Sequence, residues 1–258
     1  MSKRPLIFIT NDDSFHAKGI RLLIDIMRKL GDVIVVAPTV QRSGQSHAIT
    51  VNEPLRYHKV HQEDGYCAYV CNGTPVDCVK IAFNILMKDR KPDLLVSGIN
   101  HGSNASINTI YSGTMAAVFE GCSEGIPSIG YSIDCHSADV DFSFSENIIE
   151  NLAVDVLENG LDSGVCLNVN FPNSPIKGIK VCHQAKAYWN EDFIGRKDPM
   201  GGDYYWLTGV YNCLDESPDA DYNVLEKGYA SITPMQVDFT AYKVIDKYSD
   251  RFKRLYNE

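Results

Sequence analysis

Two adjacent carboxylates, Asp12 and Asp13, offer the clearest chemistry in the chain. They follow a short apolar run, with two residues in between. That run, residues 6–9, lacks polar alternation, which is typical of a strand buried on both faces. The acids would then lie past the carboxyl end of the strand, the edge at which open α/β sheets bind ligands. Neighbouring acids repel each other, and a cation beside them removes the repulsion. The pair predicts a hard-metal site, with a helix-capping polar turn as the alternative.

Two further loops carry neutral oxygen donors and also follow apolar runs. Ser43 lies in the polar loop 39–47 after the run 33–37, and Asn100 follows the run 94–96. If all three runs are parallel strands, their carboxyl ends share one edge. Oxygen ligands with two formal negative charges suit one Mg²⁺ or Mn²⁺ ion. The predicted metal ligands are therefore Asp12, Asp13, Ser43 and Asn100, although Ser43 alone would be no more than a solvated loop residue.

Two helix starts are candidate phosphate seats. Ser112-Gly113-Thr114 precedes the apolar segment 115–119, so free N–H groups, hydroxyls and the positive end of the helix dipole would meet there. It is not a Walker loop, because the G-x-x-x-x-G-K spacing is missing. Asn72-Gly73-Thr74 also precedes a helix. Capping by Thr74 explains that segment, and contact of its N–H groups with an anion is the alternative.

The elements that must position these residues follow one after another. Apolar residues recur at helical spacing through residues 20–30, and Gly31 marks the end of that helix. With the runs on either side it forms a βαβ unit, whose crossover is right-handed. Further short strands are indicated at 127–132, 165–171 and 179–183, and an antiparallel insertion at 48–71. The pattern predicts an α/β fold with a doubly wound, mainly parallel sheet over residues 1–185.

Residues 186–258 differ in composition. Aromatic residues and turns dominate first, and the pattern indicates an exposed β-hairpin. Such a hairpin suits a subunit interface or a lid over a base, and a satellite core under a loop is the alternative. A strand at 229–233 is expected to end at Pro234, and a basic helix is expected from about residue 241. We predict an extension for oligomerisation and for covering the site.

Bulk composition excludes several classes of protein. The formal charge of −9 argues against a nucleic-acid polymer or an anionic membrane as partner. No stretch approaches ~18 apolar residues, and the first apolar run is too short for a signal segment. A soluble, cytoplasmic protein is expected. The eight cysteines form no C-x-x-C pair, so reduced thiols are favoured over disulfides or zinc ligands.

Several motifs in order resemble the SurE family of survival-protein nucleotidases across essentially the whole chain. The motifs are Thr10-Asn11-Asp12-Asp13, Ala37-Pro38 with Gln41-Arg42-Ser43-Gly44, Asn72-Gly73-Thr74-Pro75-Val76-Asp77-Cys78, Ser97-Gly98-Ile99-Asn100, Tyr111-Ser112-Gly113-Thr114, Gly125-Ile126-Pro127-Ser128, Tyr205-Trp206, and Gly228-Tyr229-Ala230-Ser231-Ile232-Thr233-Pro234. The resemblance implies a Rossmann-like domain with a C-terminal oligomerisation element, assembled as a homodimer or homotetramer. It also implies a divalent-metal-dependent phosphatase acting on nucleoside 5′- and 3′-monophosphates, and in some members on short polyphosphate. By motif position it places metal ligation on Asp12, Asp13, Ser43 and Asn100.

The sequence also departs from the family pattern. Ser14 stands where glycine commonly follows the Asp pair. Ala105-Ser106 and Asn108 replace a usual Leu-Gly and a later acid. The predicted ligands are unaffected, whereas loop shape, substrate preference and metal affinity are open to change.

Three hypotheses of function compete. In the first, water attacks the phosphorus, and Asp12 or Asp13 acts as general base as well as ligand. In the second, a strand-end aspartate attacks and forms an aspartyl-phosphate, which ranks lower because Asp-Asp differs from the Asp-x-Asp of haloacid-dehalogenase-type phosphatases. The third is a regulatory module that binds metal and nucleotide without turnover. The chain length and the several ligand-bearing loops argue against it.

Overall fold

A nine-stranded sheet forms the centre of the computed structural model, which describes residues 4–137, 139–253 and 255. The strands run in the order β3-β4-β2-β1-β5-β6-β7-β11-β8. Their bounds are β1 Leu6–Thr10, β2 Asp32–Pro38, β3 Tyr57–Glu63, β4 Tyr66–Cys71, β5 Leu94–His101, β6 Ser128–Ile133, β7 Val165–Phe171, β8 Ile179–Val181 and β11 Ala230–Gln236. Strands β4, β2, β1, β5, β6 and β7 are parallel, and β3 and β11 pair antiparallel with β4 and β7. The predicted mainly parallel sheet is confirmed.

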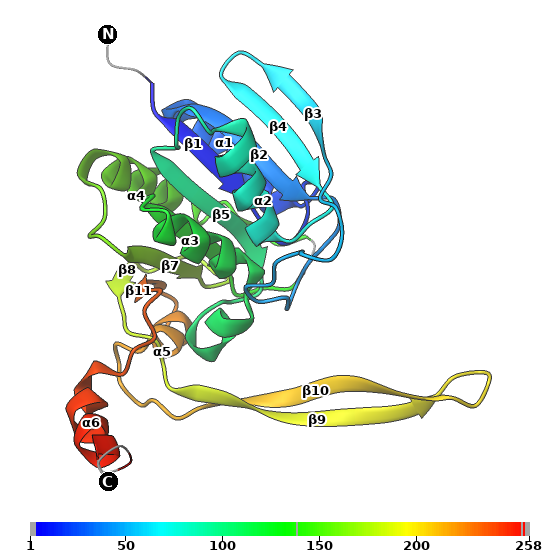
Figure 1. The fold of residues 1–258 in the computed structure, drawn as a ribbon, viewed down its shortest axis with the longest axis vertical. Helices are drawn as coiled ribbons and strands as arrows, with labels where there is room; N and C mark the ends of the chain where they lie inside the picture. Colours follow the sequence, from blue (N-terminus) through cyan, green and yellow to red (C-terminus); the bar gives the residue numbers. More distant parts are fainter. Residues whose placement is uncertain (1–3, 138, 254, 256–258) are drawn as a thin grey trace.

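Helices cover both faces of this sheet, as the doubly wound prediction requires (Figure 1). Helices α1 (Lys18–Leu30) and α4 (Glu146–Asn159) bury apolar residues in one core cluster. Helices α2 (Pro75–Ile81) and α3 (Gly113–Ser123) bury theirs in a second cluster on the opposite face. Strands β1 and β2 and the first residues of β5 are apolar without alternation because both of their faces are covered. This layering leaves the strand ends as the open edge.

The remaining helical elements connect or follow these strands and helices. They are the π-helical turn η1 (Ala82–Leu86), the 3₁₀ helices η2 (Ser106–Tyr111) and η3 (Tyr242–Val244), and the helices α5 (Asp221–Glu226) and α6 (Ile245–Lys253). Element η2 lies between β5 and α3, so it belongs to the loop that leads to the predicted phosphate seat. All eight cysteines are free thiols. Within the described residues no helix has the length and apolar character to span a membrane.

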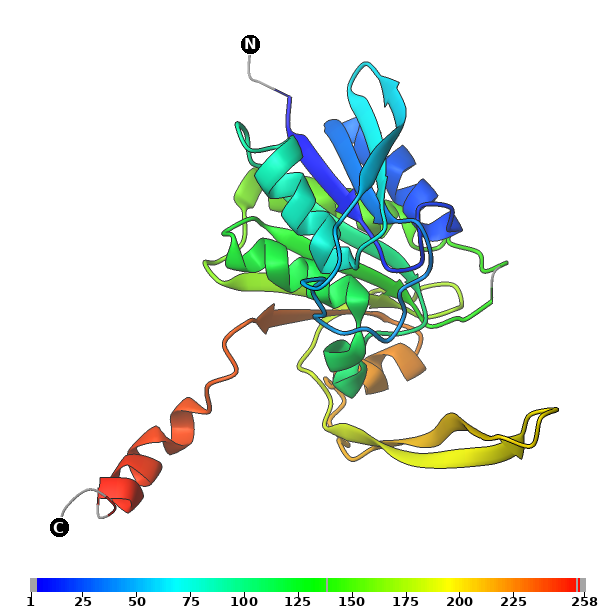
Figure 2. The same ribbon diagram turned by 45° about the vertical axis from the view of Figure 1, so that its right-hand side comes forward.

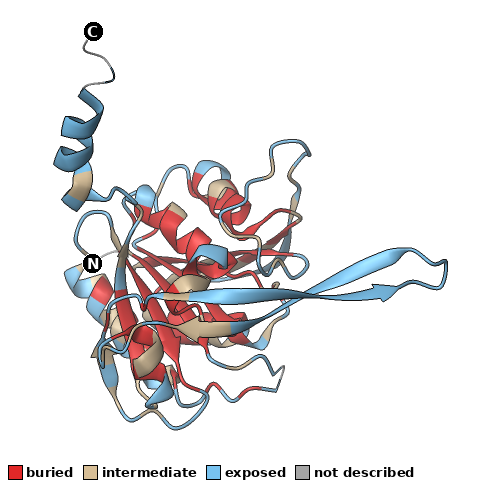
Figure 3. Cartoon of the chain, turned by 90° about the horizontal axis from the view of Figure 1, so that it is seen from below, coloured by how far each residue is buried: buried red, intermediate tan, exposed pale blue. Residues whose placement is uncertain are grey.

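The aromatic segment forms a long two-stranded hairpin, β9 (Ala187–Lys197) and β10 (Asp203–Cys213). It projects from the body, and helix α6 extends away on another side (Figure 2). Most of the hairpin is exposed, whereas the inner strands of the sheet are buried (Figure 3). The predicted exposed hairpin is therefore confirmed.

Strand β11 differs from its predicted end. It continues through Pro234, which pairs with Leu167 of β7. Proline is tolerated here because β8 pairs only with residues 230–232 of β11, so no strand needs an N–H at Pro234 on that side. Strand β11 and helix α5 lie beyond residue 185 and yet pack on the main sheet. A boundary at residue 185 therefore stays a prediction, and the hairpin and α6 are the parts that project.

Candidate active site

The three predicted ligand-bearing strands are neighbours, in the order β2-β1-β5. Their carboxyl ends therefore lie side by side, as parallel pairing dictates. A cavity of about 690 Å³ opens at this edge, and Asp12, Ser43, Asn100 and Ser112 all line it. Residues far apart in the sequence thus meet at one place.

Asp12 is the most deeply buried of the predicted ligands, with 3% of its surface exposed. Its Oδ1 accepts a hydrogen bond of 2.5 Å from Thr114 Oγ1. Burial, and secondly the charge of Asp13, raises the pKa of the Asp12 carboxyl to about 6. A carboxylate held in this way is poorly stabilised without a counter-charge, so a cation here would favour its ionised form.

Asp13 is fixed by donors from the end of β5 and from the loop after β2. Its Oδ2 accepts from the backbone N of His101 at 3.0 Å and lies 3.1 Å from the Nδ1 of the same residue. Its Oδ1 accepts from Gln41 Nε2 at 3.3 Å, and the same amide donates to Ser43 Oγ at 2.9 Å. Gln41 therefore ties two predicted ligands together. These bonds restrict the rotamer of the carboxylate before any ligand arrives.

The donor set fits a hard divalent cation. Asn100 donates its Nδ2 to Gly102 O at 2.7 Å, which leaves the amide Oδ1 as the atom available for ligation. Two carboxylates, a hydroxyl and an amide oxygen match Mg²⁺ or Mn²⁺ chemistry. No group of three or more His, Cys, Asp or Glu side chains that could hold a metal occurs among the described residues. That result agrees with a ligand set in which two of the four members are neutral.

The predicted phosphate seat at α3 lies directly against Asp12. The Ser112 hydroxyl caps the helix by accepting from Met115 N at 3.0 Å. A Cβ added at Gly113 would come within 2.9 Å of Asp12 Cβ, so glycine permits this close approach. Thr114 is fully buried and uses its hydroxyl on Asp12. Ser112 therefore lines the cavity, whereas Thr114 orients Asp12, a predicted metal ligand, through its hydrogen bond.

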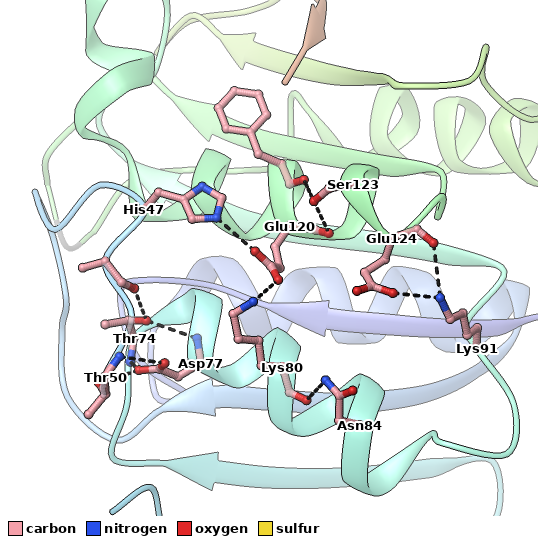
Figure 4. Close-up of polar contacts among 12 residues, drawn as sticks. His47, Thr50, Thr74, Asp77, Lys80, Asn84, Lys91, Glu120, Ser123 and Glu124 are labelled. Carbon is pink, nitrogen blue, oxygen red and sulfur yellow. Dashed lines mark hydrogen bonds and ion pairs between the residues drawn. The ribbon is translucent and has the colours of Figure 1, made fainter. Parts of the chain in front are cut away.

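The second predicted phosphate segment is occupied by structural bonds (Figure 4). Thr74 Oγ1 accepts from Asp77 N at 3.1 Å and donates to Ala48 O, while Asp77 accepts from Thr74 N. The Asn72 side chain accepts from Arg56 N at 2.8 Å. Among the described residues that line the 690 Å³ cavity, Asn72, Gly73 and Thr74 are not present. An anion contact by these residues stays a prediction.

The cavity contains residues that the sequence did not single out as site residues. They are His101, Asn104, Asn108, Tyr111, Asp134, His136, Trp189, Tyr211, Tyr222 and Glu226, with others. The position of His101 directly after Asn100 was an available signal. Trp189 comes from the base of the hairpin, and its Nε1 donates to Asn108 Oδ1 at 2.9 Å. Nothing in the local sequence pairs those two residues.

A buried amide network supports the loop between β5 and α3. Asn104 donates its Nδ2 to Ser132 Oγ at 2.8 Å, and its backbone N donates to Asn170 Oδ1 at 2.8 Å. Asn170 in turn donates to Asn168 Oδ1, and Asn168 donates to Asn104 O, both at 2.9 Å. The network joins the cavity wall to strands β6 and β7. Fully satisfied buried networks of this kind rigidify what they connect.

The fold and the site define a class of α/β protein with carboxylate, hydroxyl and amide oxygens gathered at the carboxyl edge of its parallel sheet, next to the start of a helix. A model of the family described as "Survival protein SurE" matches residues 7–191. The chain therefore belongs to the SurE family.

Relatives agree over nearly their whole length. A protein of Christiangramia forsetii named "5'-nucleotidase SurE" is 51% identical over 252 residues, covering 96% of each chain. A protein of Cytophaga hutchinsonii with the same name is 47% identical over 256 residues, covering 98% of each. The crystal structure of the SurE protein from Aquifex aeolicus is similar with a TM-score of 0.81 and 35% identity, covering 95% of this chain and 100% of that one. The suspected family is confirmed.

Proposed function

We propose that this protein is a divalent-metal-dependent phosphomonoesterase that hydrolyses nucleoside 5′-monophosphates to nucleoside and phosphate. One observation carries the proposal: Asp12, Ser43 and Asn100 line a single cavity with Ser112 at the start of α3. The names of the relatives give the substrate class. We include nucleoside 3′-monophosphates and short polyphosphate as further substrates, and Mg²⁺ or Mn²⁺ as the cofactor, one ion per subunit.

The residues that would hold the ion are Asp12, Asp13, Ser43 and Asn100. A bound divalent ion supplies Lewis acidity toward a phosphoryl oxygen and lowers the pKa of water. The N–H groups and the positive end of the dipole at the start of α3 would attract the negative charge of a phosphate bound there. Buried donors aimed at developing charge are worth more than the same donors in water.

The proton of the attacking water needs an acceptor, and we assign that role to Asp12 or Asp13. The bonds from His101 and Gln41 hold Asp13 in one orientation, and Thr114 holds Asp12. His101 Nδ1 touches Asp13, so a proton taken up by that carboxylate has an imidazole beside it. An aspartyl-phosphate remains the second mechanism, and acid quenching during turnover of AMP with a ³²P-labelled phosphate separates the two, because only the covalent route leaves the label on the protein.

The activity test is phosphate release from a panel of substrates by chelator-treated protein. The panel contains 5′- and 3′-AMP, the other nucleoside monophosphates and short polyphosphate, each with Mg²⁺, Mn²⁺, Ca²⁺, Zn²⁺ or no metal. We expect release from AMP with Mg²⁺ or Mn²⁺ and none with chelator alone. Binding of Mn²⁺ and AMP without any phosphate release would instead favour the regulatory module.

A homo-oligomer that assembles through the hairpin, and a cytoplasmic location, are further parts of this proposal. The exposed side chains of the hairpin include Phe193, Tyr205, Trp206 and Leu207. Aromatic residues are enriched at subunit interfaces, and an isolated two-stranded hairpin is marginally stable in water. Light scattering after gel filtration should give a dimer or tetramer, and a strictly monomeric protein would contradict this part.

A further inference from the structure

A second cavity of about 380 Å³ adjoins the active-site cavity on the side of the hairpin. The two cavities share three lining residues, Gly44, Tyr111 and Trp189. The remaining wall comes from the middle of the hairpin and consists of Glu191, Leu207, Thr208 and Gly209. The space next to the phosphate seat is therefore walled by two aromatic side chains and mostly small or apolar neighbours.

Trp189 is held in place without a ligand. Its Nε1 donates to Asn108 Oδ1 at 2.9 Å. Its ring packs edge-to-face with Tyr211 at 5.5 Å between centroids, and Tyr211 packs on Tyr222 at 4.7 Å. Trp189 still has 39% of its surface exposed. An aromatic face that is already ordered and still accessible can stack on a planar ligand at little cost in conformational entropy.

Tyr111 links this aromatic wall to the phosphate seat. It directly precedes Ser112, the N-cap of α3, and it is 44% exposed. Its backbone carbonyl accepts from Ser46 N at 3.1 Å, which fixes it against the loop that carries Ser43. Gly44 in that loop has a φ of +70°, and a Cβ there would meet open space. No side chain therefore fills the space at Gly44, where the two cavities adjoin.

We propose that the second cavity is the seat of the nucleobase, which stacks on Trp189 and contacts Tyr111 while the phosphate lies at the start of α3. This inference deepens the proposed function and rests on it. Stacking tolerates every base, because each has a π face. The enzyme should accept purine and pyrimidine monophosphates and favour them over phosphoesters without a base.

A binding experiment tests the seat without catalysis. The chain has two tryptophans, Trp189 and Trp206, so Trp206→Phe leaves Trp189 as the sole indole reporter. Titration of this variant with AMP or adenosine should quench its fluorescence, whereas ribose 5-phosphate should not. In the matched variant Trp189→Phe, AMP should leave the signal of Trp206 unchanged. Absence of quenching by AMP and adenosine in Trp206→Phe, or equal quenching by ribose 5-phosphate, would overturn the proposal.

A kinetic experiment separates base binding from fold. Trp189→Ala should lower kcat/KM for AMP by about tenfold or more, the scale of one lost base stack, and change that for ribose 5-phosphate by less than about twofold. Trp189→Phe should recover most of the loss, and Phe144→Ala, which removes an exposed aromatic side chain that lines neither cavity, should match the wild type on both substrates. Equal losses on both substrates would overturn the seat. If the wild type hydrolyses neither, the proposed function fails, and the fluorescence titration alone decides the seat.

Discussion

Thr114 Oγ1 donates a hydrogen bond of 2.5 Å to Asp12 Oδ1, which joins the first turn of α3 to the residue pair after β1. Thr114 is fully buried, and Asp12 is 3% exposed. The bond orients a predicted metal ligand from behind, in the way that partners of metal ligands commonly do.

Removing this bond should weaken metal binding. Thr114→Val keeps the shape and deletes the hydroxyl, so we expect about a 10- to 100-fold loss in Mn²⁺ affinity or in AMP hydrolysis. Thr114→Ser keeps the donor and should stay within severalfold of the wild type. Calorimetric titration with Mn²⁺ measures the affinity. Equal affinity in the valine and serine variants would show that the hydrogen bond has no part in ligand orientation.

The raised pKa of Asp12 predicts how the metal-free protein responds to pH. Its folded pKa of about 6 exceeds the ordinary value of 3.8, so the folded state binds this proton more tightly. The stabilisation is complete below the lower value and is lost as pH rises through about 6. At neutral pH the Asp12 carboxyl is ionised, and this shift lowers the free energy of unfolding of the metal-free protein by roughly 3 kcal/mol relative to the protonated carboxyl.

Asp12→Asn should therefore stabilise the metal-free protein at neutral pH and no longer gain stability when Mn²⁺ is added. Urea unfolding at several pH values measures both effects. The stability gap between variant and wild type should shrink as pH falls toward 4. A variant that is less stable than the metal-free wild type at neutral pH would contradict this account of the carboxyl.

Glu120 connects three elements around the site (Figure 4). Its carboxylate pairs with His47 at 3.0 Å and with Lys80, so it joins α3 to the loop after Ser43 and to α2. Hydrogen bonding to His47, and then the contact with Lys80, lowers the pKa of Glu120 despite its partial burial. The stabilisation is therefore present above its ordinary pKa and is lost as pH falls below that value.

Glu120→Gln should lower the free energy of unfolding by about 1 kcal/mol at neutral pH. The loss should vanish in acid, where the wild-type carboxyl is protonated. Glu124→Gln is the matched control at the C-cap of the same helix, because Glu124 pairs with Lys91 in a contact that is exposed on both sides. Chemical unfolding compares the two variants. Equal effects at neutral pH would mean that the bridge among three elements adds nothing beyond a surface ion pair.

The amide network predicts a stability effect from a residue remote from the predicted ligands. Asn170→Ala removes the acceptor of Asn104 N and the donor to Asn168, so buried polar groups lose their partners. We expect a loss of about 2–3 kcal/mol in unfolding free energy. Asn84→Ala, which removes an exposed bond to Lys80 O, should stay within about 0.5 kcal/mol. Similar losses in both variants would rule out a special role for the network.

The sequence predicted what local pattern controls. The apolar runs that precede Asp12, Ser43 and Asn100 identified the parallel strands. Parallel pairing alone then brings the carboxyl ends of these strands to one edge of the sheet. The pairing between strands that lie far apart in the sequence was harder to predict. The continuation of β11 past Pro234 depends on where β8 stops, which the residues around the proline do not specify.

The contacts of Trp189 and Asn104 lay beyond local pattern for the same reason. Trp189 reaches Asn108 across 81 positions, and Asn104 reaches Asn170 across 66. Such contacts follow from tertiary packing and not from spacing. Conversely, the local signals were sufficient to predict Thr74 as the N-cap of α2, and the structure adds that Asp77 completes a capping box with it.

The most direct measurement is calorimetric Mn²⁺ binding, paired with phosphate release from AMP, in the wild type and in Asp13→Asn, Ser43→Ala and Asn100→Ala. We predict one Mn²⁺ site per chain in the wild type and weaker binding in each variant, with AMP hydrolysis abolished in Asp13→Asn. Near-normal Mn²⁺ affinity together with near-normal turnover in Asp13→Asn would contradict a metal site at this edge of the sheet.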